Sequence, residues 1–139
     1  MAIRPPARLR DRPAVALALA AAWLLSRRSP ADMRTFLRAI RRGSRPATYD
    51  QAHRARDAIL AVSLHCRSDR GCLERSIATV LLCRLRGTVP TWCVGVRTQP
   101  FAAHAWVEAD GTPVDEPHPR GYYRPLITVA PIDRVVSPL

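Results

Sequence analysis

Apolar side chains recur every three or four positions through the first 86 residues, the spacing typical of helices with one buried face. The pattern predicts four helices, at about residues 13–28, 33–42, 48–65 and 72–86. A Gly-Ser-Arg-Pro stretch at residues 43–46 interrupts it and is the clearest linker. We therefore expect an N-terminal helical segment over residues 1–46 and a second domain over residues 47–139.

After Pro90, apolar positions alternate with polar ones, which indicates strands. The predicted strands lie at residues 91–97, 102–109, 112–116 and 126–130. An Asp-Gly pair between the second and third strands is typical of a tight hairpin turn. Helices followed by antiparallel strands indicate the α+β fold class, with helices packed on a small antiparallel sheet.

The chain of 139 residues is 47% apolar, enough for one compact domain or a small domain with a helical appendage. Its formal net charge is +11, and all 22 basic residues are arginine. Only 6% of the residues are aromatic, so few rings are offered for stacking on nucleic-acid bases. A solvated, arginine-rich surface is the favoured interpretation, and it would still attract acidic peptides, nucleic acid or anionic lipid.

The four cysteines show neither a Cys-x-x-Cys pair nor a zinc-binding spacing. We interpret them as free thiols in a reducing cytoplasm: Cys66, Cys72, Cys83 and Cys93. The apolar stretch at residues 13–25 is shorter than the roughly 20 residues that span a bilayer, and Ser-Arg-Arg follows it directly. We therefore expect a packed helix there, with an export signal and loose membrane association as the alternatives.

Cys72 is predicted to open the fourth helix. The unpaired amides and the dipole at a helix N-terminus favour a thiolate, which is the nucleophilic form of cysteine. Arg70 and Arg75 add positive charge nearby, and Gly71 allows another chain segment to approach closely. The same amides could stabilise a tetrahedral oxyanion. A buried helix cysteine is the alternative interpretation of this residue taken alone.

His104 shares one face of the second predicted strand with Trp106. If the Asp-Gly pair forms a two-residue turn, Trp106 faces Asp115, and Asp115 becomes a diagonal neighbour of His104. A three-residue loop would turn Asp115 to the opposite face. In the favoured register, His104 acts as a general base for a thiol, and Asp115 fixes the tautomer of the imidazole.

Cys72, His104 and Asp115 therefore have the residue types and order of a thiol acyl-transfer triad. This chemistry requires no cofactor and no metal. A metal site formed by His65, Cys66 and Cys72 is an alternative, but no fourth ligand has a suitable spacing.

Several motifs around these residues resemble one known family. They are Cys-Leu-x-Arg-Ser at 72–76, Leu-Arg-Gly at 85–87, Val-Gly-Val-Arg at 94–97 and Ala-His-Ala-Trp-Val-Glu-x-Asp-Gly at 103–111. Together they resemble the transglutaminase-like leader peptidases of lasso-peptide biosynthesis, closely over about residues 48–118.

The resemblance implies a papain-like or transglutaminase-like catalytic domain in residues 47–139. It implies a cysteine protease that removes the leader from a ribosomally made precursor peptide, with Cys72 as nucleophile, His104 as base and Asp115 as third member. Residues 1–46 read as helices rather than as a fused β-rich recognition domain, so the implied type is the split one. The implied partners are a separate leader-recognition protein and an ATP-dependent macrolactam cyclase. An acyltransferase and a non-catalytic basic binding module remain alternatives.

Overall fold

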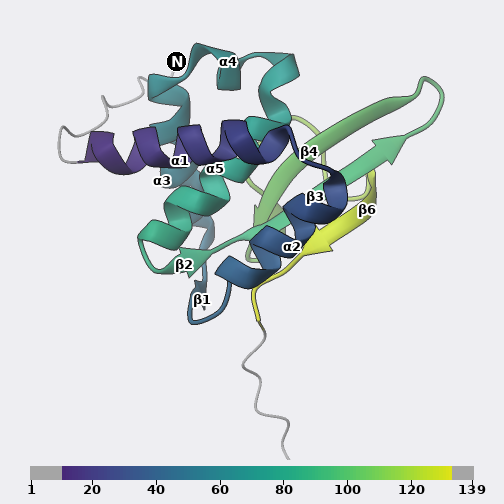
Figure 1. Ribbon diagram of the computed structural model, residues 1–139. Coiled ribbons are helices and arrows are strands. Elements are labelled where there is room, and N and C mark those ends of the chain that lie inside the picture. Colours follow the sequence, from purple (N-terminus) through teal and green to yellow (C-terminus); the bar gives the residue numbers. More distant parts are fainter. Residues whose placement is uncertain (1–10, 133–139) are drawn as a thin grey trace, which may run out of the picture.

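The computed structural model describes residues 11–132, which fold into helices gathered on one side of a sheet (Figure 1). The longer helices are α1 (Arg12–Ser26), α2 (Pro30–Ile40), α3 (Tyr49–Val62) and α5 (Cys72–Leu85). Two short helical segments, α4 (Leu64–Arg67) and a 3-10 turn (Asp69–Gly71), lie between α3 and α5. No helix in the described part of the chain is both long enough and apolar enough to cross a membrane.

The main sheet is antiparallel and has the strand order β5-β4-β3-β6. Its strands are β3 (Thr91–Arg97), β4 (Ala102–Ala109), β5 (Thr112–Pro113) and β6 (Arg124–Val129). A separate parallel pair joins β1 (Arg45–Pro46) to β2 (Thr88–Val89). The α+β prediction is therefore confirmed.

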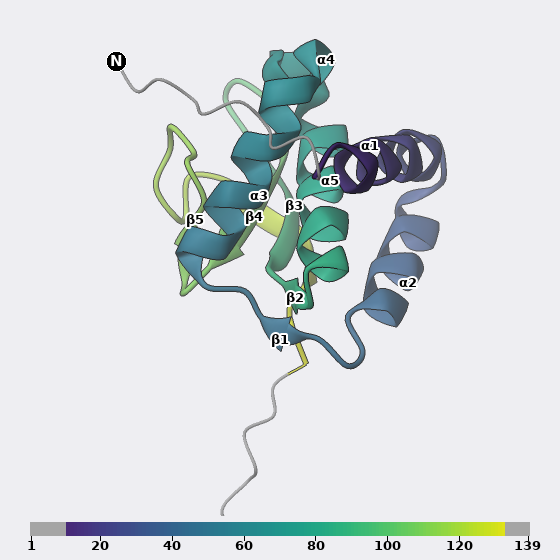
Figure 2. The same cartoon turned by 90° about the vertical axis from the view of Figure 1, so that its left-hand side faces the viewer.

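Helix α5 occupies the centre of the fold and contacts α1, α3 and β4 (Figure 2). One hydrophobic cluster includes Val15 of α1, Ile59 of α3, Ile77 of α5 and Trp92 of β3. The buried Trp92 indole satisfies its Nε1–H on Ser76 Oγ at 3.0 Å, which ties the sheet to α5. Residues on both sides of the expected boundary at residue 46 therefore share one core.

Two predicted helices differ from the observed ones next to a serine whose side chain accepts a hydrogen bond from a backbone amide. The second helix begins earlier than predicted, at Pro30, because Ser29 caps it by accepting a hydrogen bond from the Asp32 amide. The third is interrupted at Ser63, whose backbone is extended and whose Oγ accepts from the Cys66 amide at 3.1 Å. The chain after Ser63 can thus turn back toward the start of α5.

Gly71 lies where this turn meets α5, in close contact with the chain's own backbone. A Cβ atom at residue 71 would lie 2.0 Å from the His65 carbonyl oxygen and 2.9 Å from Cys66 Cα. The space beside Gly71 is thus filled by α4, and the packing sets where Cys72 enters α5.

We expect Gly71→Ala to destabilise the protein by about 3 kcal/mol, because two backbone segments must separate to admit the methyl group. Gly43→Ala is a suitable control, since residue 43 has a φ of 77° but nothing within 4 Å of a new Cβ. That control should cost about 1 kcal/mol through backbone strain alone. Urea unfolding measures both changes, and equal costs would contradict the packing role of Gly71.

Candidate active site

Cys72 is the first residue of α5 and lies against β4. Its thiol is within hydrogen-bonding range of the His104 ring and of the Ala105 backbone amide, and Arg75 contributes positive charge nearby. No side chain caps the N-terminus of α5. The structure thus brings Cys72 and His104 together.

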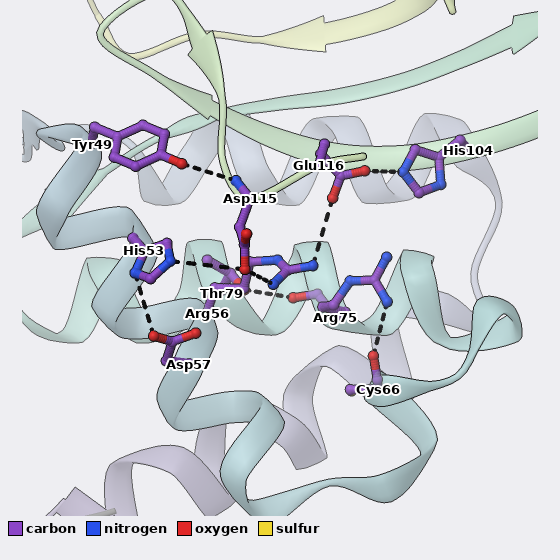
Figure 3. Close-up of polar contacts among 10 residues, drawn as sticks. All are labelled: Tyr49, His53, Arg56, Asp57, Cys66, Arg75, Thr79, His104, Asp115 and Glu116. Carbon is purple, nitrogen blue, oxygen red and sulfur yellow. Dashed lines mark hydrogen bonds and ion pairs between the residues drawn. The ribbon is translucent and has the colours of Figure 1, made fainter. Parts of the chain in front are cut away.

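The carboxylate that contacts His104 belongs to Glu116 (Figure 3). His104 Nε2 forms a hydrogen-bonded ion pair with Glu116 Oε1, which leaves the other ring nitrogen for Cys72. The Glu116 side chain is only 7% exposed, so this pair is shielded from water. The prediction that Asp115 lies beside His104 is wrong, because its carboxylate points instead toward Arg56.

The backbone of Asp115 explains the exchange of the two carboxylates. The hairpin has the predicted register, with Glu108 opposite Pro113 and Ala109 opposite Thr112. One more ladder bond follows, from the Val114 amide to the Val107 carbonyl at 2.9 Å. Asp115 then adopts a φ of 49°, a left-handed conformation that aspartate tolerates better than most residues. Regular alternation ends there, and Glu116 takes the place that the register assigned to Asp115.

Arg56 of α3 lies behind both carboxylates. Its Nη1 donates to Asp115 Oδ2 at 3.0 Å, and its Nη2 lies 3.7 Å from Glu116 Oε2. His53 approaches the same Asp115 oxygen at 3.8 Å from the solvent side. Nothing in the alternation of apolar residues distinguishes Arg56 from the many surface arginines, and so sequence reasoning missed it.

The surroundings of the Cys72–His104 pair favour its charged form. Burial opposes ionisation of Cys72, but the hydrogen bonds to His104 and to the Ala105 amide outweigh it and lower the thiol pKa. Burial likewise opposes protonation of His104, but the hydrogen bonds to Cys72 and Glu116 raise its pKa from 6.5 to about 9. Both shifts therefore favour a thiolate beside an imidazolium.

The other three cysteines have the opposite electrostatic setting. All three are buried, whereas Cys72 is partly accessible. Burial raises the pKa of Cys66, raises that of Cys83 to about 11, and together with Glu108 raises that of Cys93 to about 12. Only Cys72 has the lowered pKa and the access that a nucleophile needs.

Two aromatic rings lie beside His104. Trp106 stacks at 5.8 Å from the imidazole, on the same face as predicted, and Tyr123 lies at 5.0 Å. The indole also closes over Gly95, where a Cβ would lie 2.9 Å from Trp106 Cη2. These rings form a small pocket with several residues of the following loop, namely Pro113, Glu116, His118, Pro119, Arg120 and Gly121.

The described residues contain one group with the donor types of a metal site: His53, Asp57 and Asp115. The Arg56 guanidinium already binds the Asp115 carboxylate, and its positive charge would repel a cation. His65, which the sequence offered as an alternative ligand beside Cys66 and Cys72, lies 3.4 Å from the Glu74 carboxylate instead. Beside His104 the structure thus places the Cys72 thiol and the Glu116 carboxylate.

Comparison with family models matches residues 15–128 to the transglutaminase-like superfamily. Comparisons with curated proteins and with solved structures found no significant match. The matched region extends from α1 into β6, so it contains Cys72, His104 and both carboxylates of the hairpin. The chain belongs to the transglutaminase-like superfamily.

Proposed function

We propose that this protein is a cysteine peptidase that removes the leader from a ribosomally made lasso-peptide precursor. Cys72 is the nucleophile, His104 the acid and base, and Glu116 the orienting carboxylate in place of Asp115. The single observation that supports this most strongly is the position of His104, which lies beside the Cys72 thiol and is hydrogen-bonded to the buried Glu116 carboxylate. Superfamily membership and the quoted motifs support the same reaction class.

In the first half of the reaction, the Cys72 thiolate adds to the scissile carbonyl carbon, and backbone amides at the start of α5 stabilise the oxyanion. The His104 imidazolium then donates its proton to the leaving amine as the carbon–nitrogen bond breaks. In the second half, neutral His104 takes a proton from water, and the hydroxide attacks the thioester carbonyl. The leader leaves as a carboxylic acid, and the thiolate–imidazolium pair is restored.

We further propose that a separate recognition protein delivers the leader, and that an ATP-dependent cyclase uses the freed amine, both in the cytoplasm. The second candidate function is acyl transfer, which is supported by the superfamily match. The two functions share the acyl-Cys72 intermediate and differ in whether water or an amine attacks it.

Cys72→Ala and His104→Ala should each reduce leader removal by at least about a thousandfold, because each removes a group that acts at the reacting atoms. Cys83→Ala is the matched control, since Cys83 lies on the same helix but is buried away from the site. Mass spectrometry of the precursor after incubation with each variant and the recognition protein measures the effect. Retained cleavage by a folded Cys72→Ala protein would exclude Cys72 as the nucleophile.

Glu116→Gln and Asp115→Asn are neighbouring, isosteric changes that separate the two carboxylates. Glu116→Gln should slow cleavage by about a hundredfold or more, because the imidazolium loses its charged partner. Asp115→Asn should slow it only several-fold, because the amide oxygen can still accept from Arg56. Steady-state kcat/KM compares them, and a larger loss in Asp115→Asn would restore Asp115 as the third member.

The imidazole of His104 should titrate at about pH 9, well above its usual 6.5. Since its pKa is raised, the imidazolium persists through neutral pH and is lost as the pH rises through about 9. Thiolate should form below the usual cysteine pKa of 9.0, so both charges coexist between the two transitions. NMR of the four histidines, with absorbance of the thiolate, follows both groups. An imidazole that titrates near 6.5 would contradict the ion pair.

A further inference from the structure

Arg56 is the only arginine that is buried among the described residues of this arginine-rich chain. It projects from α3, one of the helices that cover α5, and its side chain is 11% exposed. A buried guanidinium is costly unless it is matched by opposite charge and by hydrogen bonds. The groups that pair with the Arg56 guanidinium therefore contribute to the fold or to the site.

Its partners include the two consecutive carboxylates at the end of the hairpin, as Figure 3 shows. The planar guanidinium reaches Asp115 with Nη1 at 3.0 Å and Glu116 with Nη2 at 3.7 Å. Lysine could not serve both in the same way, because an ammonium is a point charge without this fork. Arg56 thus connects the carboxylate that binds His104 to a second carboxylate at the surface.

Helix α3 holds the same segment through Tyr49 as well. The Tyr49 hydroxyl accepts a hydrogen bond from the Asp115 amide at 3.1 Å, and the Tyr49 amide donates to Asp110 Oδ2 at 2.9 Å. Both ends of the short strand β5 are therefore attached to the first turn of α3.

Glu116 depends on these attachments because no regular strand holds it. Strand β5 ends at Pro113, and the left-handed Asp115 separates Glu116 from the last ladder bond at Val114. The direction of the Glu116 side chain is thus set by what contacts it, which is His104 in front and Arg56 behind.

We propose that Arg56 is a positioning residue that holds Glu116 against His104, with Asp115 as the second anchor of its guanidinium. The inference rests on the proposed function, since it gives α3 a role in orienting the catalytic imidazole. It assigns to Asp115 a structural contact with Arg56 rather than a contact with the base.

Removal of Arg56 has two opposed effects on the pKa of His104. The direction of the observed change therefore tells whether Arg56 acts by holding Glu116 in place or only through its own charge. A nearby cation disfavours the imidazolium, so loss of its field alone would raise the His104 pKa. Loss of a fixed Glu116 would lower it, because the bond to Glu116 is one of the causes that raise it. The other charged or titratable groups around His104 are unchanged by the substitution: Cys72 and Arg75 from α5, His118 and Arg120 from the loop after the hairpin, and Tyr123 ahead of β6.

The test is NMR titration of His104 in the full chain for Arg56→Gln and Arg56→Lys, with Arg54→Gln as control. Arg54 lies on the same helix but is 75% exposed and pairs only with the exposed Asp50 at 2.8 Å. We expect the His104 midpoint to fall by about one pH unit in Arg56→Gln. Arg56→Lys should recover only part of this shift, and Arg54→Gln should not move the midpoint.

Combination of Arg56→Gln with Glu116→Gln tests whether Arg56 acts through Glu116. The His104 midpoint of the double variant should be no lower than that of Glu116→Gln alone. Two substitutions that remove the same interaction have effects that do not add. A midpoint that rises or stays in the folded Arg56 variants, or a full additional fall in the double variant, would overturn the inference. A normal His104 midpoint in the wild-type protein would instead overturn the proposed function, so the two failures are distinguishable.

Discussion

His104 lies between the Cys72 thiol and the buried Glu116 carboxylate, to which it is hydrogen-bonded, and the rest of the fold holds these two partners in place. Each partner enters from a different element. Cys72 is placed by the start of α5, which is fixed by the close packing of Gly71 on the backbone of α4. Glu116 is placed by the end of the hairpin, which is tied to α3 through Arg56 and Tyr49. The His104 imidazole thus lies between Cys72 from the helical layer and Glu116 from the end of the hairpin.

The alternation of apolar and polar residues was enough to predict the central sheet. The bounds of β3 and β4 agree with the predicted strands, and the Asp-Gly turn has the predicted two-residue register. These features are local, because period-two alternation and turn chemistry are properties of adjacent residues. The sequence placed Cys72 at a helix start and His104 on the polar face of a strand, and these placements are local as well.

The third member of the site could not be obtained in this way. A single left-handed residue, Asp115, ends the alternation and brings Glu116 into the position that the register gave to its neighbour. Arg56 contacts both adjacent carboxylates, and its hydrogen bond to Asp115 spans 59 positions of the chain. A long-range ion pair of this kind leaves no periodic signal, and arginines are too common in this sequence for Arg56 to be distinctive. Within the Val-Asp-Glu-Pro sequence, the aspartate could have indicated where the alternation ends, since aspartate tolerates a left-handed backbone.

The proposed mechanism requires an acyl-enzyme at Cys72, and trapping with hydroxylamine tests for this intermediate most directly. The precursor, the recognition protein and the wild-type enzyme are incubated with increasing hydroxylamine, and the leader products are weighed by mass spectrometry. A thioester intermediate predicts that leader hydroxamate forms at the expense of leader acid, because the added nucleophile competes with water for the acyl group. Cleavage that gives only leader acid at every hydroxylamine concentration would show that water attacks the peptide bond directly. That result would contradict an acyl-enzyme at Cys72.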